Sequence, residues 1–437
     1  MSDIFAANQS GKTFSIPYLT GIMLAVNAVA DSCLVVDGLN CVLPQNDLIA
    51  DNHDLFSTLL SEDGRHRVIC TMSAPIPQQA DQEKNLQSLL TSISGSRDFS
   101  AILLTALPFL RLSGLDYEGL AREAGGIIPV RAVPPLSLEA DWLDGYGNAL
   151  DSLASALPPA KKRPRRATVA VVGYMRDRNE DDHAANMKEL RRLLALAGLE
   201  LVCVFPSGGN FRGLAAALEA QVIVSLPYGR KAARRIAAMS KARLVETGLP
   251  MGLAGTSDWL AAVRRAAGLK GSLPPALKKE EAGAAAKISP LLDALAHRKL
   301  LFAGDPYLCA AVFSFARELC MRPSAALLDC RPKELGIAAL PPNVLFSPSA
   351  GEARSAAKKM LEDGLPAMAV SNSFGVTEGM TEGMPHIELG FPSYRHHCIG
   401  DEPFLGYAGA ARLACRLLNA AQSGAPGQGK PSAPFSA

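Results

Sequence analysis

The amino-acid sequence predicts an α/β protein built from three Rossmann-like, doubly wound units with parallel sheets. Short apolar runs at residues 101–105, 168–173 and 299–304 have the length and the β-branched or leucine-rich composition of strands buried on both faces. Each run leads through a loop into an amphipathic helical pattern. Strand–helix alternation of this kind is typical of parallel sheets that are covered by helices.

The clearest repeat lies in the middle of the chain. A helical pattern runs from Met187 to Ala197 and stops at Gly198, a residue that commonly follows a helix end. The next strand is predicted at residues 201–205, where four of the five residues are apolar and β-branched or aromatic types are frequent. This strand–helix–strand order indicates that the second unit is a complete Rossmann-like domain.

Two breaks separate the units. Residues 157–167 are rich in proline, alanine and basic side chains, and residues 270–287 are polar and low in complexity. We therefore expect four segments: an N-terminal α/β domain at 1–165, a second Rossmann-like domain at 166–285, a third at 286–421, and a disordered tail at 422–437.

Charge and composition exclude several classes of protein. Lys and Arg number 44 against 42 Asp and Glu, so nothing draws the chain strongly to nucleic acid or an anionic membrane. The basic run at residues 161–166 is interpreted as a solvated linker, with a polyanion or partner site as the alternative. No secretory signal and no run of about 18 uncharged apolar residues occurs, so we expect a cytoplasmic protein.

Two segments imitate phosphate-binding loops. The sequence Ala-Ala-Asn-Gln-Ser-Gly-Lys-Thr at residues 6–13 has no room before it for a buried strand, and Pro17 follows it closely, so we do not expect nucleotide binding there. Residues 207–210, Ser-Gly-Gly-Asn, lack the Gly-x-Gly-x-x-Gly spacing and predict a plain tight turn.

The nine cysteines of a cytoplasmic chain do not suggest a disulfide framework. Five of them lie within apolar patterns or have no partner at a useful spacing, and we expect these to be buried, as free cysteines usually are. They are Cys203, Cys309, Cys320, Cys330 and Cys415.

Three N-terminal cysteines are candidate metal ligands. Cys33 enters a predicted buried strand, Cys41 lies in the loop just beyond it, and Cys70 ends the strand-like residues 67–69. Loops at the carboxyl ends of parallel strands are where open α/β sheets bind ligands, and thiolates are the usual ligands of iron–sulfur clusters. No Cys-x-x-Cys spacing occurs and three thiols cannot close a four-ligand site, so three ordinary buried cysteines remain the alternative.

The C-terminal region resembles nitrogenase component 1 proteins. Residues 390–397, Gly-Phe-Pro-Ser-Tyr-Arg-His-His, and residues 403–410, Pro-Phe-Leu-Gly-Tyr-Ala-Gly-Ala, look like the C-terminal signature of that family, and the Arg-His-His variant is similar to its β-type subunits. Weaker matches follow the family's order. They are residues 37–41 against its His-Gly-Pro-x-Gly-Cys loop, 112–116 against its Ile-Gly-x-Asp element, 248–252 with Thr256 and Trp259, and 371–373.

The resemblance implies a cluster held between two subunits, with up to three cysteines from each. Cys41 matches the second of those positions, whereas the first falls on Ser15 and the third near Pro108. Cys70 has no counterpart in the family but lies between matched segments and could compensate. The resemblance gives His396 and His397 a structural or interface role, since they match the β-type motif rather than a cofactor ligand.

Residues 224–227, Val-Ser-Leu-Pro, match the stretch that carries the cofactor cysteine of catalytic subunits, and they contain no cysteine. The resemblance therefore implies a β-like subunit of a nitrogenase-like ATP-dependent reductase, with a [4Fe–4S] cluster shared with an α-like partner. A separate ATP-dependent iron–sulfur protein would be the electron donor. The alternatives are a scaffold subunit in assembly of the nitrogenase iron–molybdenum cofactor, and a metal-free structural relic of the family.

Overall fold

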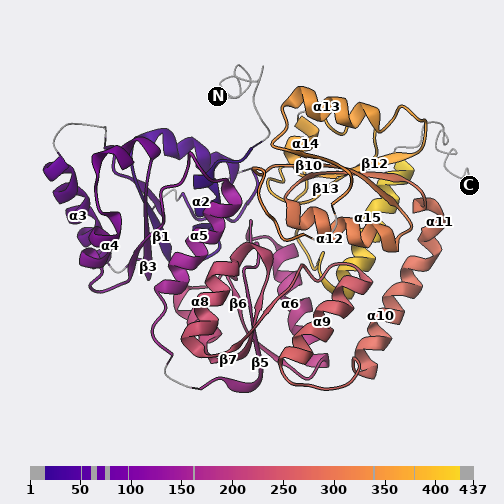
Figure 1. The fold of residues 1–437 in the computed structure, drawn as a ribbon, viewed down its shortest axis with the longest axis horizontal. Coiled ribbons are helices and arrows are strands. Elements are labelled where there is room, and N and C mark those ends of the chain that lie inside the picture. Colours follow the sequence, from indigo (N-terminus) through magenta and orange to yellow (C-terminus); the bar gives the residue numbers. More distant parts are fainter. Residues whose placement is uncertain are drawn as a thin grey trace, which may run out of the picture.

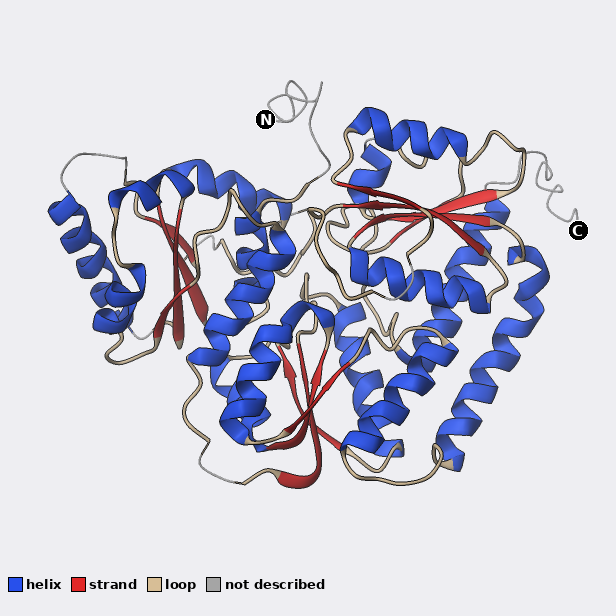
Figure 2. Ribbon diagram, in the orientation of Figure 1, coloured by secondary structure: helices blue, strands red, loops and turns tan. Residues whose placement is uncertain are grey.

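The computed structural model contains three parallel sheets, and helices cover both faces of each (Figures 1 and 2). It describes residues 15–50, 52–60, 66–73, 79–96, 98–160, 163–337, 340–377 and 379–423. The phosphate-loop imitation at 6–13 and nearly all of the tail expected at 422–437 lie outside these residues. None of the described helices is long and apolar enough to cross a membrane.

The first sheet has the strand order β2-β1-β3-β4, and all neighbouring strands are parallel. Its strands are β1 (Ser32–Asp37), β2 (Val68–Cys70), β3 (Ala101–Ala106) and β4 (Val130–Ala132), and its helices are α2 (Tyr18–Asn27), α3 (Gln79–Ser96), α4 (Tyr117–Ala124) and α5 (Trp142–Ser155), with the 3-10 helices η1 (Asn40–Leu48) and η2 (Pro108–Ser113). Every residue of β1 and β3 is buried, as the continuous apolar runs predict.

The second sheet has the order β6-β5-β7-β8. Its strands are β5 (Arg165–Val172), β6 (Glu200–Phe205), β7 (Ala220–Ser225) and β8 (Arg243–Glu246), and its helices are α6 (Asp181–Leu196), α7 (Phe211–Leu214), α8 (Arg230–Ser240) and α9 (Leu253–Ala266), with η3 (Ala215–Glu219) and η4 (Pro227–Gly229). The strand β5, the helix α6 and the strand β6 form the strand–helix–strand repeat that the sequence predicts.

The third sheet has five strands in the order β11-β10-β9-β12-β13. Its strands are β9 (Lys299–Gly304), β10 (Arg322–Leu328), β11 (Asn343–Phe346), β12 (Ala367–Ser371) and β13 (His386–Glu388), and its helices are α11 (Leu292–Leu295), α12 (Pro306–Glu318), α13 (Ala350–Lys359), α14 (Ser373–Thr377) and α15 (Gly406–Ser423), with η5 (Ser289–Leu291). The polar break predicted at 270–287 is instead mostly helix α10 (Pro275–Ile288).

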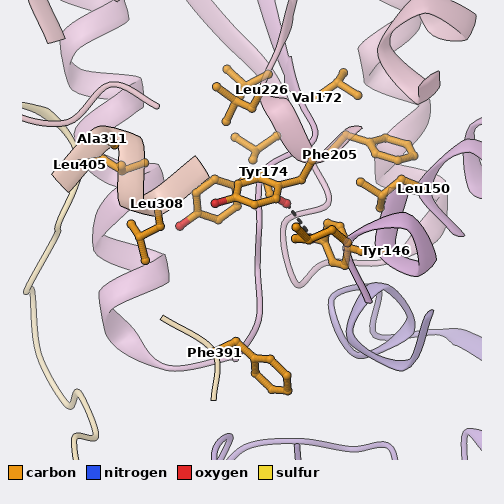
Figure 3. Close-up of a cluster of buried hydrophobic side chains, with 14 of the residues drawn as sticks. Tyr146, Leu150, Val172, Tyr174, Phe205, Leu226, Leu308, Ala311, Phe391 and Leu405 are labelled. Carbon is orange, nitrogen blue, oxygen red and sulfur yellow. Dashed lines mark hydrogen bonds between the residues drawn. The ribbon is translucent and has the colours of Figure 1, made fainter. Parts of the chain in front are cut away.

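One hydrophobic core connects the three units. The two faces of β1 contact different cores. Leu34 and Val36 belong to the shared core, whereas Cys33 and Val35 belong to a smaller core under α3 and α4. Figure 3 shows the middle of the shared core, where Tyr146 of α5 donates a hydrogen bond to the carbonyl of Tyr174, at 2.7 Å. Apolar burial of this extent across all three sheets holds the units together as one body.

Helix α5 lies between the first and second units and contacts elements of both (Figure 1). It crosses α2 so closely that a Cβ atom at Gly21 would lie 1.8 Å from the carbonyl oxygen of Trp142. The indole Nε1 of Trp142 donates to the backbone oxygen of Asp329, at 3.2 Å, and so reaches the third unit.

Helix α15 returns from the third unit to pack on the second. It contacts α6, α9 and α10. The side-chain oxygen of Asn186 in α6 accepts hydrogen bonds from the amides of Phe404 and Leu405, at 2.9 and 3.0 Å, just before α15 begins. The Tyr407 hydroxyl of α15 lies 2.7 Å from the Ser257 hydroxyl of α9. The second unit is therefore completed by a helix from a distant part of the sequence.

Candidate functional site

The carboxyl edge of the first sheet brings together two of the three candidate cysteines. Strand β1 ends at Asp37 and strand β2 ends at Cys70, and the parallel pairing sets Val36 beside Cys70. Cys41 lies in η1, four residues beyond the end of β1 by way of Gly38. Strand order reverses at β1, and such reversal points are where open α/β sheets form their binding crevices.

The thiol of Cys70 lies against the loop that leads to Cys41. Its Sγ donates to the carbonyl oxygens of Gly38 and Leu39, at 2.8 and 3.0 Å, and the residue is half-buried. These contacts join the end of β2 to the loop that follows β1. Cys41 and Cys70 are 29 residues apart in the sequence. We call the segments at residues 37–41 and 70–71 the thiol edge.

The thiol edge begins with a fully buried carboxylate, that of Asp37. Asp37 accepts hydrogen bonds from the Thr71 hydroxyl at 2.6 Å, the Tyr117 hydroxyl at 2.9 Å and the Gln82 amide at 3.1 Å. Its donors come from the end of β2 and from helices α3 and α4. Sequence analysis missed this group; the signal for it is an aspartate that directly follows four apolar residues and precedes a glycine.

The other predicted or considered ligands lie elsewhere. Cys33 is near the amino end of β1, on the face packed under α3 and α4, and burial raises the pKa of its thiol to about 12 although Arg67 lowers it. Its position opposite Ile102 rather than at the strand end separates it from the thiol edge. Ser15 is exposed before α2, and Pro108 begins η2. No contact in the described residues brings Cys33 or Ser15 to Cys70.

The expectation that the remaining cysteines are buried is confirmed for three and wrong for two. Cys203, Cys309 and Cys330 are buried, but Cys320 and Cys415 are exposed. Cys320 follows the end of α12 in a left-handed backbone conformation, with φ of +57°, and Cys415 lies on the outer face of α15. An apolar sequence neighbourhood does not tell which side of a helix or which helix end faces water.

The thiol edge fits an iron–sulfur cluster only as one part of a shared site. Among the described residues, no group of three or more His, Cys, Asp or Glu side chains is arranged to hold a metal ion. A four-ligand cluster therefore needs thiolates from a second chain in addition to Cys41 and Cys70. For Cys70 to ligate, its sulfur must lose its proton and turn from the two carbonyl oxygens, because a thiolate has no hydrogen to donate.

A second polar site lies where the three units meet. A cavity of about 50 Å³ lies there, enough for roughly three or four water molecules. Its aromatic and apolar walls include Trp142 from the first unit, Tyr174 and Tyr228 from the second and Phe391 from the third. None of the described residues that line it is a cysteine, and residues 224–227 contain none either.

The junction is held by a carboxylate between two histidines. Asp177, in the loop after β5, lies 2.6 Å from Nε2 of His183 and 3.5 Å from Nε2 of His53, which comes from the first unit. The Nδ1 atom of His53 accepts a hydrogen bond from the amide of Ser393 in the third unit, at 2.8 Å. Burial would raise the pKa of Asp177, but the two histidines outweigh it and hold this pKa well below its usual value.

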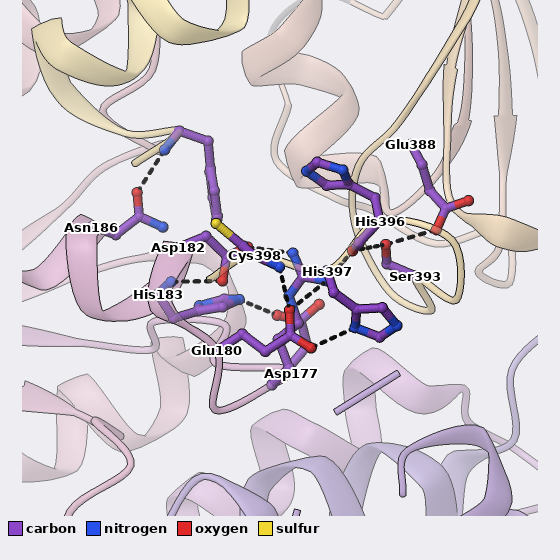
Figure 4. Close-up of polar contacts among 12 residues, drawn as sticks. Asp177, Glu180, Asp182, His183, Asn186, Glu388, Ser393, His396, His397 and Cys398 are labelled. Atoms are coloured by element: carbon purple, nitrogen blue, oxygen red, sulfur yellow. Dashed lines mark hydrogen bonds and ion pairs between the residues drawn. The ribbon is translucent and has the colours of Figure 1, made fainter. Parts of the chain in front are cut away.

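A buried arginine connects the same loop to the C-terminal motif, and Figure 4 shows Glu180 of that loop beside His397 of the motif. Arg178 forms a short ion pair with Asp182, lies 3.5 Å from Glu180 and donates to the backbone oxygen of His396, at 2.8 Å. Glu180 in turn binds Nδ1 of His397, at 2.6 Å. Burial, with Arg416 and Arg178 nearby, lowers the pKa of His396 to about 4. These contacts give the Arg-His-His motif a role in joining the second and third units.

Comparison with known proteins identifies the family to which this fold belongs. Three Rossmann-like units around one core define a three-unit α/β protein, and a family model described as nitrogenase component 1 type oxidoreductase matches residues 80–422. The chain belongs to this family. A solved structure titled nitrogenase Cp1 at pH 6.5 superposes with a TM-score of 0.78 over 94% of this chain and 93% of that chain, at 16% identity, which shows the fold.

Curated relatives include two chains of multi-subunit proteins. The nitrogenase molybdenum-iron protein beta chain of Bradyrhizobium diazoefficiens is 23% identical over 319 residues, or 63% of this chain and 58% of that protein. Subunit N of the light-independent protochlorophyllide reductase of Roseiflexus sp. is 25% identical over 251 residues, or 57% of this chain and 56% of that protein. The matches thus span little more than half the length of these relatives.

Proposed function

We propose that this chain is a β-type subunit of a nitrogenase-like, ATP-dependent reductase and that Cys41 ligates an iron–sulfur cluster shared with an α-like partner. The observation that carries the proposal is the thiol edge: Cys70 lies against the loop that delivers Cys41, at the strand ends where this fold binds ligands. Two thiols from one chain suit half of an interfacial [4Fe–4S] site.

The cluster, when bound, would accept and pass on single electrons. The chain's own part is to supply thiolate at Cys41, with Cys70 as the second thiol, and to hold both at a fixed edge of a rigid sheet. Every residue of β1 is buried and β1 lies between β2 and β3 in the sheet, so the strand that leads to Cys41 has little freedom to move. A separate ATP-dependent iron–sulfur protein would deliver the electrons.

The substrate pocket in this proposal lies mainly on the α-like partner. The supporting observation is the cavity at the three-unit junction, which is only about 50 Å³ and has no cysteine among the described residues that line it. A subunit with so small a cavity can carry electrons and stabilise an assembly without binding a substrate of its own.

A scaffold subunit in cofactor assembly is the second candidate. The observation that favours it is the small number of thiols: Cys41 alone keeps the family's register, and a cluster held by fewer thiolates is more easily released to another protein. Transfer of iron from the purified complex to a metal-free acceptor protein would support the scaffold, and steady substrate reduction with iron retained would support the reductase.

Replacing Cys41 with alanine should remove most of the iron from the complex, because residues 38–48 contain no other cysteine. The complex of the full chain with its α-like partner is purified without oxygen, and iron and acid-labile sulfide are measured per heterodimer. Cys70→Ala should cause a smaller loss, since its thiol must turn to reach a cluster.

Cys33→Ala serves as the matched control and also tests that residue's predicted ligation. Its thiol is enclosed by the core under α3 and α4, so this variant should keep its iron and lose only stability. An equal loss of iron in Cys33→Ala would restore Cys33 as a ligand. A wild-type complex without iron would exclude both cluster proposals and leave the metal-free relic.

A further inference from the structure

The buried carboxylate of Asp37 is held by neutral hydrogen-bond donors. Among the described residues no salt bridge includes it, and its oxygens accept only from Thr71, Tyr117 and Gln82. Placing an ionised carboxylate in a protein interior is unfavourable unless hydrogen bonds satisfy it. Three donors from three different elements satisfy it here, at the strand end that leads to Cys41.

The hydroxyl of Thr71 connects this carboxylate to the loop. Because a carboxylate only accepts, the Thr71 proton points to Asp37, and the lone pairs of the hydroxyl oxygen are left for other donors. The amide of Gly38 donates to that oxygen at 3.0 Å. The amide of Thr71 donates to the Val36 carbonyl at 3.1 Å, which continues the pairing with β1 beyond the last residue of β2.

The loop between Asp37 and Cys41 is thereby fixed from two sides. On the β2 side, Thr71 binds the Gly38 amide, and Cys70 binds the carbonyls of Gly38 and Leu39. On the β3 side, the amide of Leu107 donates to the Asp37 carbonyl at 2.9 Å, and a Cβ atom at Gly38 would lie 2.5 Å from Cδ1 of Leu107. Glycine is required by this close approach.

We propose that Asp37 and Thr71 are positioning residues that fix the backbone from Gly38 to Cys41 beside Cys70, at the place where the shared metal group would bind. The inference rests on the proposed function and adds residues that touch no metal. Partners that orient ligands in this way commonly change metal affinity by about 10–100-fold when removed.

The test compares Thr71→Val with Thr71→Ser in the full complex, purified without oxygen. Valine keeps the shape of threonine and loses the hydroxyl, whereas serine keeps the hydroxyl. The matched control is Thr168→Val in the second unit, where a buried threonine hydroxyl likewise accepts a backbone amide, from Gln221 at 3.0 Å, outside the sheet that carries the thiol edge.

Thr71→Val should lower the affinity for iron by about 10-fold or more and alter the absorption and electron paramagnetic resonance spectra of the complex. Thr71→Ser and Thr168→Val should keep both iron and spectra. In the metal-free chain, iodoacetamide should label Cys41 and Cys70 several times faster in Thr71→Val than in Thr168→Val, as followed by peptide mass spectrometry.

The outcomes separate this inference from the function on which it rests. A wild-type complex without iron overturns both. A wild-type complex with iron, together with a Thr71→Val complex of equal iron content and unchanged spectra, overturns the positioning role alone. Equal labelling rates in Thr71→Val and Thr168→Val also contradict it, because the loop would then be held by other contacts.

Discussion

Replacing Arg178 with methionine should lower the free energy of unfolding by about 3–5 kcal/mol near neutral pH. The Arg178 side chain is 7% exposed and lies between Asp182 and Glu180, which are 8% and 0% exposed. Methionine fills much of the same volume but leaves two buried carboxylates without their cation. Urea unfolding followed by circular dichroism measures the loss.

The deficit of Arg178→Met should shrink as the pH falls from 7 to about 4. Burial raises the pKa of Asp182, but His183 and Arg178 together hold it below its usual value. A carboxyl with a depressed pKa stabilises the fold above its unfolded pKa of about 3.9, and this contribution is lost as the pH falls through the folded value. Without Arg178 the Asp182 carboxyl can take up a proton at higher pH. Protonation removes the cost of the unpaired buried charge and so reduces the stability deficit of the variant.

The matched control is Arg165→Met. The Arg165 side chain is 51% exposed and pairs with Glu200 and Glu219, which are 61% and 43% exposed, so its removal should cost about 1 kcal/mol or less. Equal losses in the two variants would show that the Arg178 cluster contributes no more than a surface ion pair. A deficit in Arg178→Met that stays constant with pH would exclude the carboxylates as its cause.

Replacing Gly21 with alanine should destabilise the protein by about 3 kcal/mol, at the upper end for an overpacked core. The added Cβ would lie 1.8 Å from the Trp142 carbonyl oxygen, which is backbone and cannot turn aside. The contact is mutual, since a Cβ at Gly145 would lie 2.0 Å from the Tyr18 carbonyl oxygen. Helices α2 and α5 would have to separate. Thermal unfolding by calorimetry measures the change.

Gly283→Ala in α10 is the matched control, because a Cβ there meets no atom within 4 Å. Alanine has the higher helix propensity, so this variant should gain about 0.5–1 kcal/mol. If Gly21→Ala also gained stability, the close crossing of α2 and α5 would be disproved.

The sequence predicts those strands that are buried on both faces. The run at 299–304 coincides with β9, and the runs at 101–105 and 168–173 fall within one to three residues of β3 and β5. Their signal is local, since a continuous apolar run needs no knowledge of its neighbours. The family resemblance agrees with the matched family model, although it was carried mainly by one C-terminal motif.

Helix α10 shows why composition misled at residues 270–287. Lysine, glutamate and alanine there are strong helix formers, and only Leu277, Ala284 and Ile288 of this helix are buried. A helix with so narrow an apolar side has almost no hydrophobic pattern, and its packing against α15 depends on a segment more than a hundred residues later. The low-complexity sequence at residues 270–287 therefore belongs mostly to a solvent-facing helix and not to a linker.

The polar sites depend on contacts between segments far apart in the sequence. Asp177 meets His53 across 124 residues, and His53 meets Ser393 across 340. Each residue alone would be assigned to the surface, because charged side chains are seldom buried without a partner. The sequence did point to Cys41 and Cys70 by their place at strand ends, but only the fold brings Cys70 to the Gly38–Leu39 carbonyls.

Helix α15 has a consequence for how the protein is made. The second unit leaves the ribosome with the α6 and α9 surfaces uncovered, since the helix that packs on them is translated only after the whole third sheet. Until then, Asn186 of the second unit lacks the amides of Phe404 and Leu405, and Ser257 lacks the Tyr407 hydroxyl. Folding of the middle of the chain therefore finishes last, and a stop codon anywhere within the third unit would leave two incomplete units.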